Sequence, residues 1–254
     1  MHLNTFSIVA RCPRTGRLGV AVSTAVPSVG SICPFVQSGV GAVSTQSWVN
    51  PYLAIDALAL MQQGTAAPSA LNTVIASDEG RALRQFGIVD ARGVASAYTG
   101  GDCTPWCGHR IGPGYAVQGN MLANETVVAE MEAAFIGSEM EDLAERLMRA
   151  LEAGQAAGGD KRGKQSAALK IHGQEAYPWL DLRVDEHASP VKELRRVLGV
   201  ASVQLRPFID AMPTRAGSGA PMPASVTDML ALAPQDRPGA RASTTPQKCA
   251  PGAD

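Results

Sequence analysis

The chain has 254 residues, 45% of them hydrophobic, which is enough to bury a large core. Its 22 basic and 23 acidic side chains give a formal net charge of −1, so it lacks the positive field that a nucleic-acid partner would require. Neither a signal sequence nor an apolar run of the roughly 20 residues that cross a membrane is evident, so we expect a cytoplasmic protein without membrane contact. The five cysteines, an odd number, favour reduced thiols over disulfides.

The first half of the chain alternates between strand-like and helix-like patterns. β-Branched runs on either side of the turn residues Pro13 and Gly16 predict a hairpin at the start. Apolar residues at three- and four-residue spacing then predict a pair of helices, the first of which ends at Gly64. Strands are expected over residues 5–11, 18–24, 39–46, 83–90 and 94–100, and helices over 52–64 and 66–77.

The second half begins with a glycine-rich stretch, residues 101–122, that is predicted to be a loop. Helices are then expected over 125–137, 139–154 and 189–199, and strands over 166–171 and 179–184. Runs of strands separated by helix pairs are typical of an α+β fold, in which stacked sheets carry helices on their outer faces. Enrichment in Pro, Gly, Ala and Ser beyond about residue 205 predicts a disordered tail. We therefore expect one domain over residues 1–204 and a tail over 205–254.

Five sequence blocks in a fixed order carry a family resemblance. They are TFSIVAR, GVGAVSTQSWVNP, GDCTPWCGHRIGPGYAVQGNML, LEAGQAAGGDKRGKQSAAL and DLRVDEHASPVKELRRVL. Together, over residues 4–199, they resemble the DUF1028 family, which is related to the N-terminal nucleophile (Ntn) hydrolases. The resemblance implies a four-layer αββα sandwich and a candidate mechanism, but no particular reaction.

The resemblance places Thr5 where Ntn hydrolases carry their nucleophile. In such enzymes the α-amino group of the first residue, with a pKa near 8, serves as general base to its own side chain. Here the residues MHLN precede Thr5. Either translation starts later than written, or the Asn4–Thr5 bond is cleaved autocatalytically, or Thr5 is an ordinary strand residue and the protein has no such mechanism. Ser7, two residues further along the same strand face, is expected to be a neighbouring hydroxyl.

A second group of candidate residues lies in the loop before the strand predicted over 166–171. Glycines let this loop approach a ligand closely and point its backbone N–H groups inward. The polar side chains that it carries are Asp160, Arg162, Lys164, Gln165 and Ser166. They are expected to bind a carboxylate, to bind a cation through Asp160, or to stabilise an oxyanion, with Lys164 also able to tune the amine of Thr5. The alternative is a solvated glycine turn whose charges face water.

A third group comes from residues 106–120. Asn120 at a strand end is expected to donate into an oxyanion hole, and Gln118 and Trp106 to contact the substrate. His109 is a candidate base or ligand, although a structural hydrogen bond is the commoner role of a loop histidine. The CxxxC spacing of Cys103 and Cys107 has no second ligand pair, so neither a metal nor another cofactor is expected.

These residues lead to one preferred function and two alternatives. We expect an Ntn-type hydrolase that cleaves an amide or other C–N bond in a small, carboxylated molecule, with Thr5 forming an acyl enzyme. Its expected partner is this small-molecule substrate, and whether the chain also forms a homo-oligomer is left open. The runner-up is a non-catalytic small-molecule-binding or assembly protein that keeps the fold, which the MHLN extension favours. A thiol redox protein that uses Cys103 and Cys107 is a remote third.

Overall fold

The computed structural model describes residues 5–219 and 221–240. Within it the chain divides into two compact units, with the boundary between Arg195 and Arg196. The first unit is an α+β structure with two antiparallel sheets, and the predicted fold class is therefore confirmed at that level. No helix of the described residues combines the length and the apolarity needed to cross a membrane.

The larger sheet has six strands, among them the first and the last strand of the described residues. Its spatial order is β10-β9-β2-β1-β8-β7, and every neighbouring pair is antiparallel. The strands are β1 (Thr5–Arg11), β2 (Leu18–Thr24), β7 (Gly108–Gly112), β8 (Tyr115–Asn120), β9 (Ser166–His172) and β10 (Pro178–Val184). The predicted opening hairpin is confirmed as β1 and β2, which lie at the centre of this sheet and are almost completely buried.

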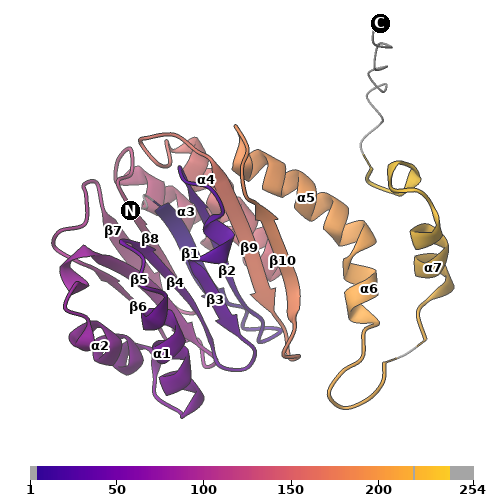
Figure 1. Cartoon of the computed structure of the whole chain (residues 1–254), viewed down its shortest axis with the longest axis horizontal. Coiled ribbons are helices and arrows are strands. Elements are labelled where there is room, and N and C mark those ends of the chain that lie inside the picture. The colour runs from indigo at the N-terminus through magenta and orange to yellow at the C-terminus, as the bar shows by residue number, and fades with distance from the viewer. Residues whose placement is uncertain (1–4, 220, 241–254) are drawn as a thin grey trace, which may run out of the picture. The chain divides into compact units, whose positions relative to one another are not determined.

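The smaller sheet has four strands in the order β3-β4-β5-β6. They are β3 (Pro34–Gln37), β4 (Gly41–Ser47), β5 (Arg84–Asp90) and β6 (Ala95–Thr99). The two sheets pack face to face, with β1 of one against β4 and β5 of the other (Figure 1). Strand β3 lies in a segment for which the sequence predicted no regular structure.

Helices cover the outer faces of both sheets. Helices α1 (Pro51–Gln62) and α2 (Ala67–Ser77) pack on the four-stranded sheet, and α3 (Thr126–Ile136) and α4 (Leu143–Ala156) pack on the six-stranded sheet (Figure 1). Local chemistry explains two of the starts: the side chain of Asn50 accepts a hydrogen bond from the backbone of α1, and that of Asp142 does the same for α4. The helix pairs predicted from apolar spacing are confirmed within a few residues.

The prediction of a loop over residues 101–122 is wrong, because this stretch contains the hairpin of β7 and β8. The glycine content of this stretch favours a loop, but several of the glycines make room for large side chains. A Cβ at Gly112 would overlap the ring of Tyr115, and one at Gly119 would lie 2.5 Å from the side chain of Leu122. Glycine here serves close packing inside strands, a use that composition alone does not distinguish from a turn.

The second unit contains further helices. Helix α5 (Pro190–Gln204) begins in the first unit and ends in the second, which also holds α6 (Arg206–Asp210), α7 (Ala224–Ala231) and a short 3-10 turn at Pro234–Asp236. The unit boundary thus falls nine residues before the predicted one, and part of the predicted tail is helical. Residues 241–254, the rest of that tail, lie outside the described residues.

Candidate active site

The space between the two sheets changes character along the length of the strands. At one end it is filled by apolar side chains, those of Val9, Leu18, Val20, Val36, Ala42, Val89 and Ala116. At the other end it is filled by buried hydroxyl and amide groups, those of Thr5, Ser7, Ser44, Gln46, Gln85, Gln118 and Asn120. The change occurs within single strands, since Thr5, Ser7 and Val9 are alternate residues on one face of β1. We call the second set the polar layer.

Thr5 lies at the outer edge of the polar layer, in a row of paired residues. It is opposite Asn120 on β8 and opposite Thr24 on β2. The hydroxyl of Thr5 donates to that of Thr24 over 3.3 Å, and its carbonyl accepts a hydrogen bond from the amide of Gln46 over 3.1 Å. Thr5 is completely buried, and its nitrogen is part of the peptide bond to Asn4. Both its main chain and its side chain are thus held in place.

An amide and hydroxyl network joins the two sheets beneath Thr5. The hydroxyl of Ser7 donates to Gln46 Oε1 and accepts from Gln118 Nε2, each over 2.6 Å. The Oε1 of Gln85 accepts from Gln46 Nε2 over 2.7 Å and from Asn120 Nδ2 over 3.0 Å. An amide nitrogen carries two hydrogens, so Asn120 retains one donor beyond its bond to Gln85. That second N–H is the group that the predicted oxyanion-hole role requires.

One acceptor in this network has no partner within the described residues: Gln118 Oε1. It lies directly against Gly87 of β5, where any Cβ would overlap the amide. The sheets approach so closely here because position 87 has no side chain. Burying an amide oxygen without a hydrogen bond costs about 1–3 kcal/mol, so the polar layer carries a stability cost at this atom.

Asp160 fixes the glycine loop beside the ends of β2 and β8. Its carboxylate is buried and accepts hydrogen bonds from the backbone N–H of Ala25 over 3.1 Å and of Arg162 over 2.9 Å. The guanidinium of Arg162 pairs with it over 3.1 Å. The next residue, Lys161, donates to the carbonyl of Pro105 over 2.8 Å. With its oxygens occupied in this way, the Asp160 carboxylate acts within the protein as a positioning group for the loop.

Ser166 and Gln165 also hold backbone. The hydroxyl of Ser166 donates to the carbonyl of Val26 over 2.6 Å and accepts from the N–H of Val29 over 3.1 Å. The N–H of Gln165 donates to the carbonyl of Thr24 over 2.8 Å, which ties the loop to the strand beside Thr5. These contacts fix the segment that leaves β2, directly after Thr24.

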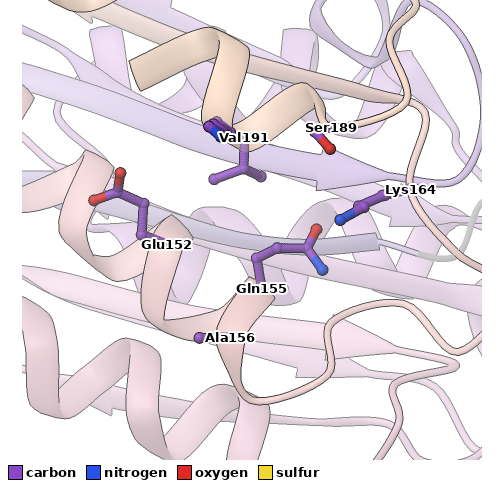
Figure 2. A pocket seen from close by; sticks show the side chains of 7 residues that line it. Glu152, Gln155, Ala156, Lys164, Ser189 and Val191 are labelled. Atoms are coloured by element: carbon purple, nitrogen blue, oxygen red, sulfur yellow. The ribbon is translucent and has the colours of Figure 1, made fainter. Parts of the chain in front are cut away.

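Lys164 is exposed and lines a cavity of about 300 Å³ at the start of α5. Figure 2 shows the ends of the Lys164 and Gln155 side chains turned toward the same space, near Ser189. The Oε1 of Gln155 is buried and has no hydrogen-bond partner in the described part of the chain. A second cation, Lys192, also lines the cavity, whereas Glu152 is its one carboxylate. The cavity therefore offers two ammonium groups and an amide to a ligand.

Residues of the β7–β8 hairpin lie at the side of the polar layer. His109 pairs with Gln118 in the sheet, and its Nδ1 lies 2.9 Å from the hydroxyl of Thr99 on β6. Partial desolvation lowers the pKa of His109, although its side chain is exposed, and the contact with Thr99 is a structural one between the sheets. Trp106 contributes its carbonyl, which accepts from the N–H of Leu122. Cys103 is buried, with its thiol against the carbonyl of Arg84.

The structure thus brings Thr5, Gln118 and Asn120 into one layer and sets the glycine loop beside it. Sequence reasoning missed three members of this neighbourhood, Thr24, Gln46 and Gln85. A signal was present, because Ser44 and Gln46 are alternate polar residues of β4, a strand whose residues are all buried. Polar residues at a spacing of two in a strand buried on both faces indicate a polar contact between sheets.

Comparison with known proteins supports the family resemblance. The model of a family described as one of unknown function, DUF1028, matches residues 5–194. The crystal structure of protein SPO2555 from Silicibacter pomeroyi, assigned to the same family, is 28% identical, covers 85% of this chain and 97% of its own, and superposes with a TM-score of 0.78. Anbu, an ancestral beta-subunit from Yersinia bercovieri, is 13% identical over 78% of this chain and 94% of its own, with a TM-score of 0.40. No curated protein matches the chain.

Proposed function

Because the chain belongs to the DUF1028 family, whose function is unknown, we propose a function from the site itself: a hydrolase of amide or other C–N bonds that uses Thr5 as an N-terminal nucleophile. The observation that carries the proposal is the place of Thr5. It begins a central strand, its hydroxyl donates to the hydroxyl of Thr24, and an amide with a spare N–H lies directly opposite. The resemblance of the motifs to Ntn hydrolases supports the same assignment.

The proposed mechanism starts with cleavage of the Asn4–Thr5 peptide bond by water. Cleavage turns a peptide nitrogen, which is not basic, into an α-amine with a pKa near 8. The carbonyl of Thr5 stays bonded to Gln46, so the new terminus is held where the hydroxyl already lies. Maturation then requires no rearrangement of β1, because the polar layer is assembled before the cut.

In the reaction the neutral amine of Thr5 accepts the proton of its own hydroxyl, and Oγ1 attacks the substrate carbonyl. The second N–H of Asn120 stabilises the oxyanion that forms. The proton then passes to the leaving nitrogen as the C–N bond breaks, which leaves an ester on Thr5. Water, activated by the same amine, hydrolyses this ester and releases the acid.

We base the proposed substrate class on the charges near the glycine loop, at a cavity lined by Lys164 and, among the described residues, by no member of the polar layer. Lys164 and Lys192 line a cavity large enough for a small molecule, and ammonium groups favour an anionic ligand. A small amide that carries a carboxylate fits this description. In this proposal Lys164 binds the carboxylate, and Arg162 and Asp160 hold the loop that presents it.

The first test is the intact mass of the protein expressed from the full reading frame. The hydrolase requires a mass that begins at Thr5. A mass beginning at Met1 or His2 would instead favour the alternative function, a small-molecule-binding or assembly protein in which Thr5 remains internal. That alternative is supported by the peptide-bonded nitrogen of Thr5 and by the hydrogen bonds that already pair Ser7 and Gln46 with other protein groups beneath it.

The second test is activity on a panel of N-acyl amino acids and ω-amides of amino acids, followed by release of the amine or ammonia. Thr5→Ala should abolish release, and Thr5→Ser should retain part of it because the hydroxyl remains. Thr45→Ala is the matched control: Thr45 is another buried strand threonine, but its hydroxyl bonds to the carbonyl of Asn50, away from the polar layer. Equal rates in the Thr5→Ala variant and the wild type would refute the mechanism.

A further inference from the structure

A second cavity lies at the opposite end of β1 from Thr5. Arg11 ends the strand that Thr5 begins, and six residues of extended chain span about 20 Å. The cavity has a volume of about 360 Å³ and is lined by Arg11, Arg14 and Arg146, by two prolines, and by Phe135, Glu139 and Met140. It belongs to the hairpin turn after β1 and to the ends of α3 and α4, which take no part in the proposed reaction.

The residues that line this cavity carry a net positive charge. Three arginines line it and only one acidic residue, Glu139, among the residues that the structure describes. Arg146 is only 8% exposed, and burial lowers its pKa. Neither Arg11 nor Arg146 forms an ion pair with a carboxylate in the described part of the chain. Arginine is rarely buried without a counter-charge, since removing a charge from water is costly unless an opposite charge replaces it.

Two N–H groups of these arginines have no acceptor among the described residues. The Nε atoms of Arg11 and Arg146 are buried and have no hydrogen-bond partner among the described residues. Arg146 uses one terminal nitrogen on the carbonyl of Phe135, 3.3 Å away, and lies 3.9 Å over the centre of its ring, which fixes its orientation. The guanidinium is therefore held in place while its Nε–H has nothing to donate to.

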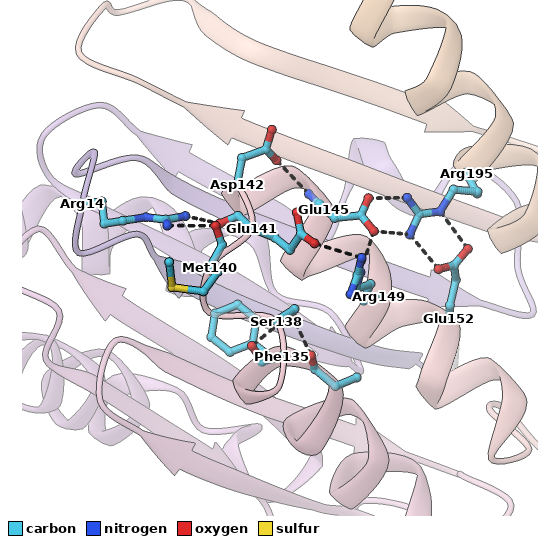
Figure 3. A network of polar contacts seen from close by, with 11 residues as sticks. Arg14, Phe135, Ser138, Met140, Glu141, Asp142, Glu145, Arg149, Glu152 and Arg195 are labelled. Atoms are coloured by element: carbon cyan, nitrogen blue, oxygen red, sulfur yellow. Dashed lines mark hydrogen bonds and ion pairs between the residues drawn. The ribbon is translucent and has the colours of Figure 1, made fainter.

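Arg14 closes one side of the cavity. Figure 3 shows its side chain reaching from the hairpin turn to the carbonyls of Met140 and Glu141, the first over 2.8 Å. Both hydrogen bonds link the β1–β2 turn to the segment between α3 and α4. Arg14 thus forms one side of the cavity and adds a positive charge to it. Because its guanidinium is bonded to these carbonyls, the other two arginines are the groups that bind a ligand.

We infer that this cavity binds a small organic anion, whose carboxylate or phosphate takes hydrogen bonds from Arg11 and Arg146 and whose apolar part contacts the prolines and Met140. The planar guanidinium fork matches both anionic groups, and such hydrogen bonds are about twice as strong as those between neutral groups. The site is distinct from the Thr5 site, so the two can be tested separately.

The test uses the full chain with benzoate, phenyl phosphate and the uncharged control benzamide, at an ionic strength held constant with NaCl so that general screening is equal. A saturable rise in Tm with benzoate, phenyl phosphate or both, and none with benzamide, supports the inference and shows which anionic group is preferred. No rise with either anion overturns it.

Arginine variants and NMR spectra of the arginine side chains test whether the anion binds in this cavity. Arg11→Gln should weaken the anion about tenfold or more, because one charge-assisted hydrogen bond is lost. Arg81→Gln, a change to an exposed arginine outside the cavity, should leave the affinity unchanged. In the wild type, ¹⁵N spectra of the arginine Nε–H groups should show the anion shifting the signals of Arg11 and Arg146, assigned with Arg11→Lys. Equal affinity in Arg11→Gln, or shifts confined to other arginines, refutes the site.

Discussion

His172 gives the stability of this protein a defined dependence on pH. It ends β9, opposite Leu18 of β2, and is 7% exposed. Neither of its ring nitrogens has a hydrogen-bond partner within the described residues. Burial, assisted by the charge of Lys170 and opposed by that of Asp181, lowers its pKa from 6.5 to about 4. The folded protein therefore keeps this imidazole neutral where the unfolded chain would protonate it.

The direction in which the free energy of unfolding changes with pH depends on whether the folded or the unfolded state binds the proton. Between pH 6.5 and pH 4 the unfolded chain takes up a proton at His172 and the folded protein does not, so the free energy of unfolding falls as the pH falls. Above pH 7 both states are neutral and the contribution is flat. With these two pKa values the loss is about 2 kcal/mol by pH 5 and about 3 kcal/mol by pH 4.

The measurement is urea unfolding followed by tryptophan fluorescence at pH 7.5 and pH 5, in the wild type and in His172→Leu. Leucine cannot be protonated and leaves no ring nitrogen unpaired, so the variant should match or exceed the wild type at pH 7.5 and lose about 2 kcal/mol less on acidification. Other groups that titrate are the same in both proteins and cancel. Thr15→Ala, which changes an exposed residue that does not titrate, is the control and should show the same pH dependence as the wild type. An equal pH dependence in wild type and His172→Leu would refute the assignment.

Three other changes test the packing. Gly87→Ala should cost about 1–3 kcal/mol of unfolding free energy, and less in a Gln118→Ala background, where the overlapping amide is gone; a double-mutant cycle in urea measures the difference. Arg195→Gln removes ion pairs from α5 to two carboxylates of α4 and should cost about 1 kcal/mol at low salt and less in 1 M NaCl, since these groups are partly exposed and screened. Removal of residues 205–254 should leave Tm nearly unchanged; a fall of several degrees would mean that these residues dock on the rest of the chain.

Patterns with a short period allowed most of the fold to be predicted. The apolar spacing of α1 and α4 and the β-branched runs of β1 and β2 are local signals, and each element forms within a few residues of its prediction. The β7–β8 hairpin was missed because its glycines are explained only by their neighbours in space, as Gly112 is by Tyr115. The sequence shows that a glycine is present, but not whether it forms a turn or makes room for a ring.

The candidate site was predictable in part for the same reason. The family resemblance indicates Thr5 and the amide chemistry indicates Asn120, and the antiparallel register of β1 and β8 places them opposite each other. Gln46 and Gln85 come from the other sheet, and their contact with Thr5 and Asn120 depends on how the two sheets stack. Stacking is set by side chains distant in the sequence, so the spacing of Ser44 and Gln46 indicates a polar contact between sheets but does not identify the residues on the other side of it.

The division of the inter-sheet space into a polar and an apolar half also determines how the two sheets can assemble. If one sheet slid along the other by a single side-chain pair, the amide of Gln46 would meet the methyl groups of Val9 instead of Ser7, and its donor and acceptor would be buried unpaired. An entirely apolar interface would tolerate such a shift far better, because contacts among aliphatic groups are not directional. The hydroxyl and amide groups around Thr5 therefore fix the register in which the two sheets stack. The polar layer is assembled in the same step in which the two sheets pack together.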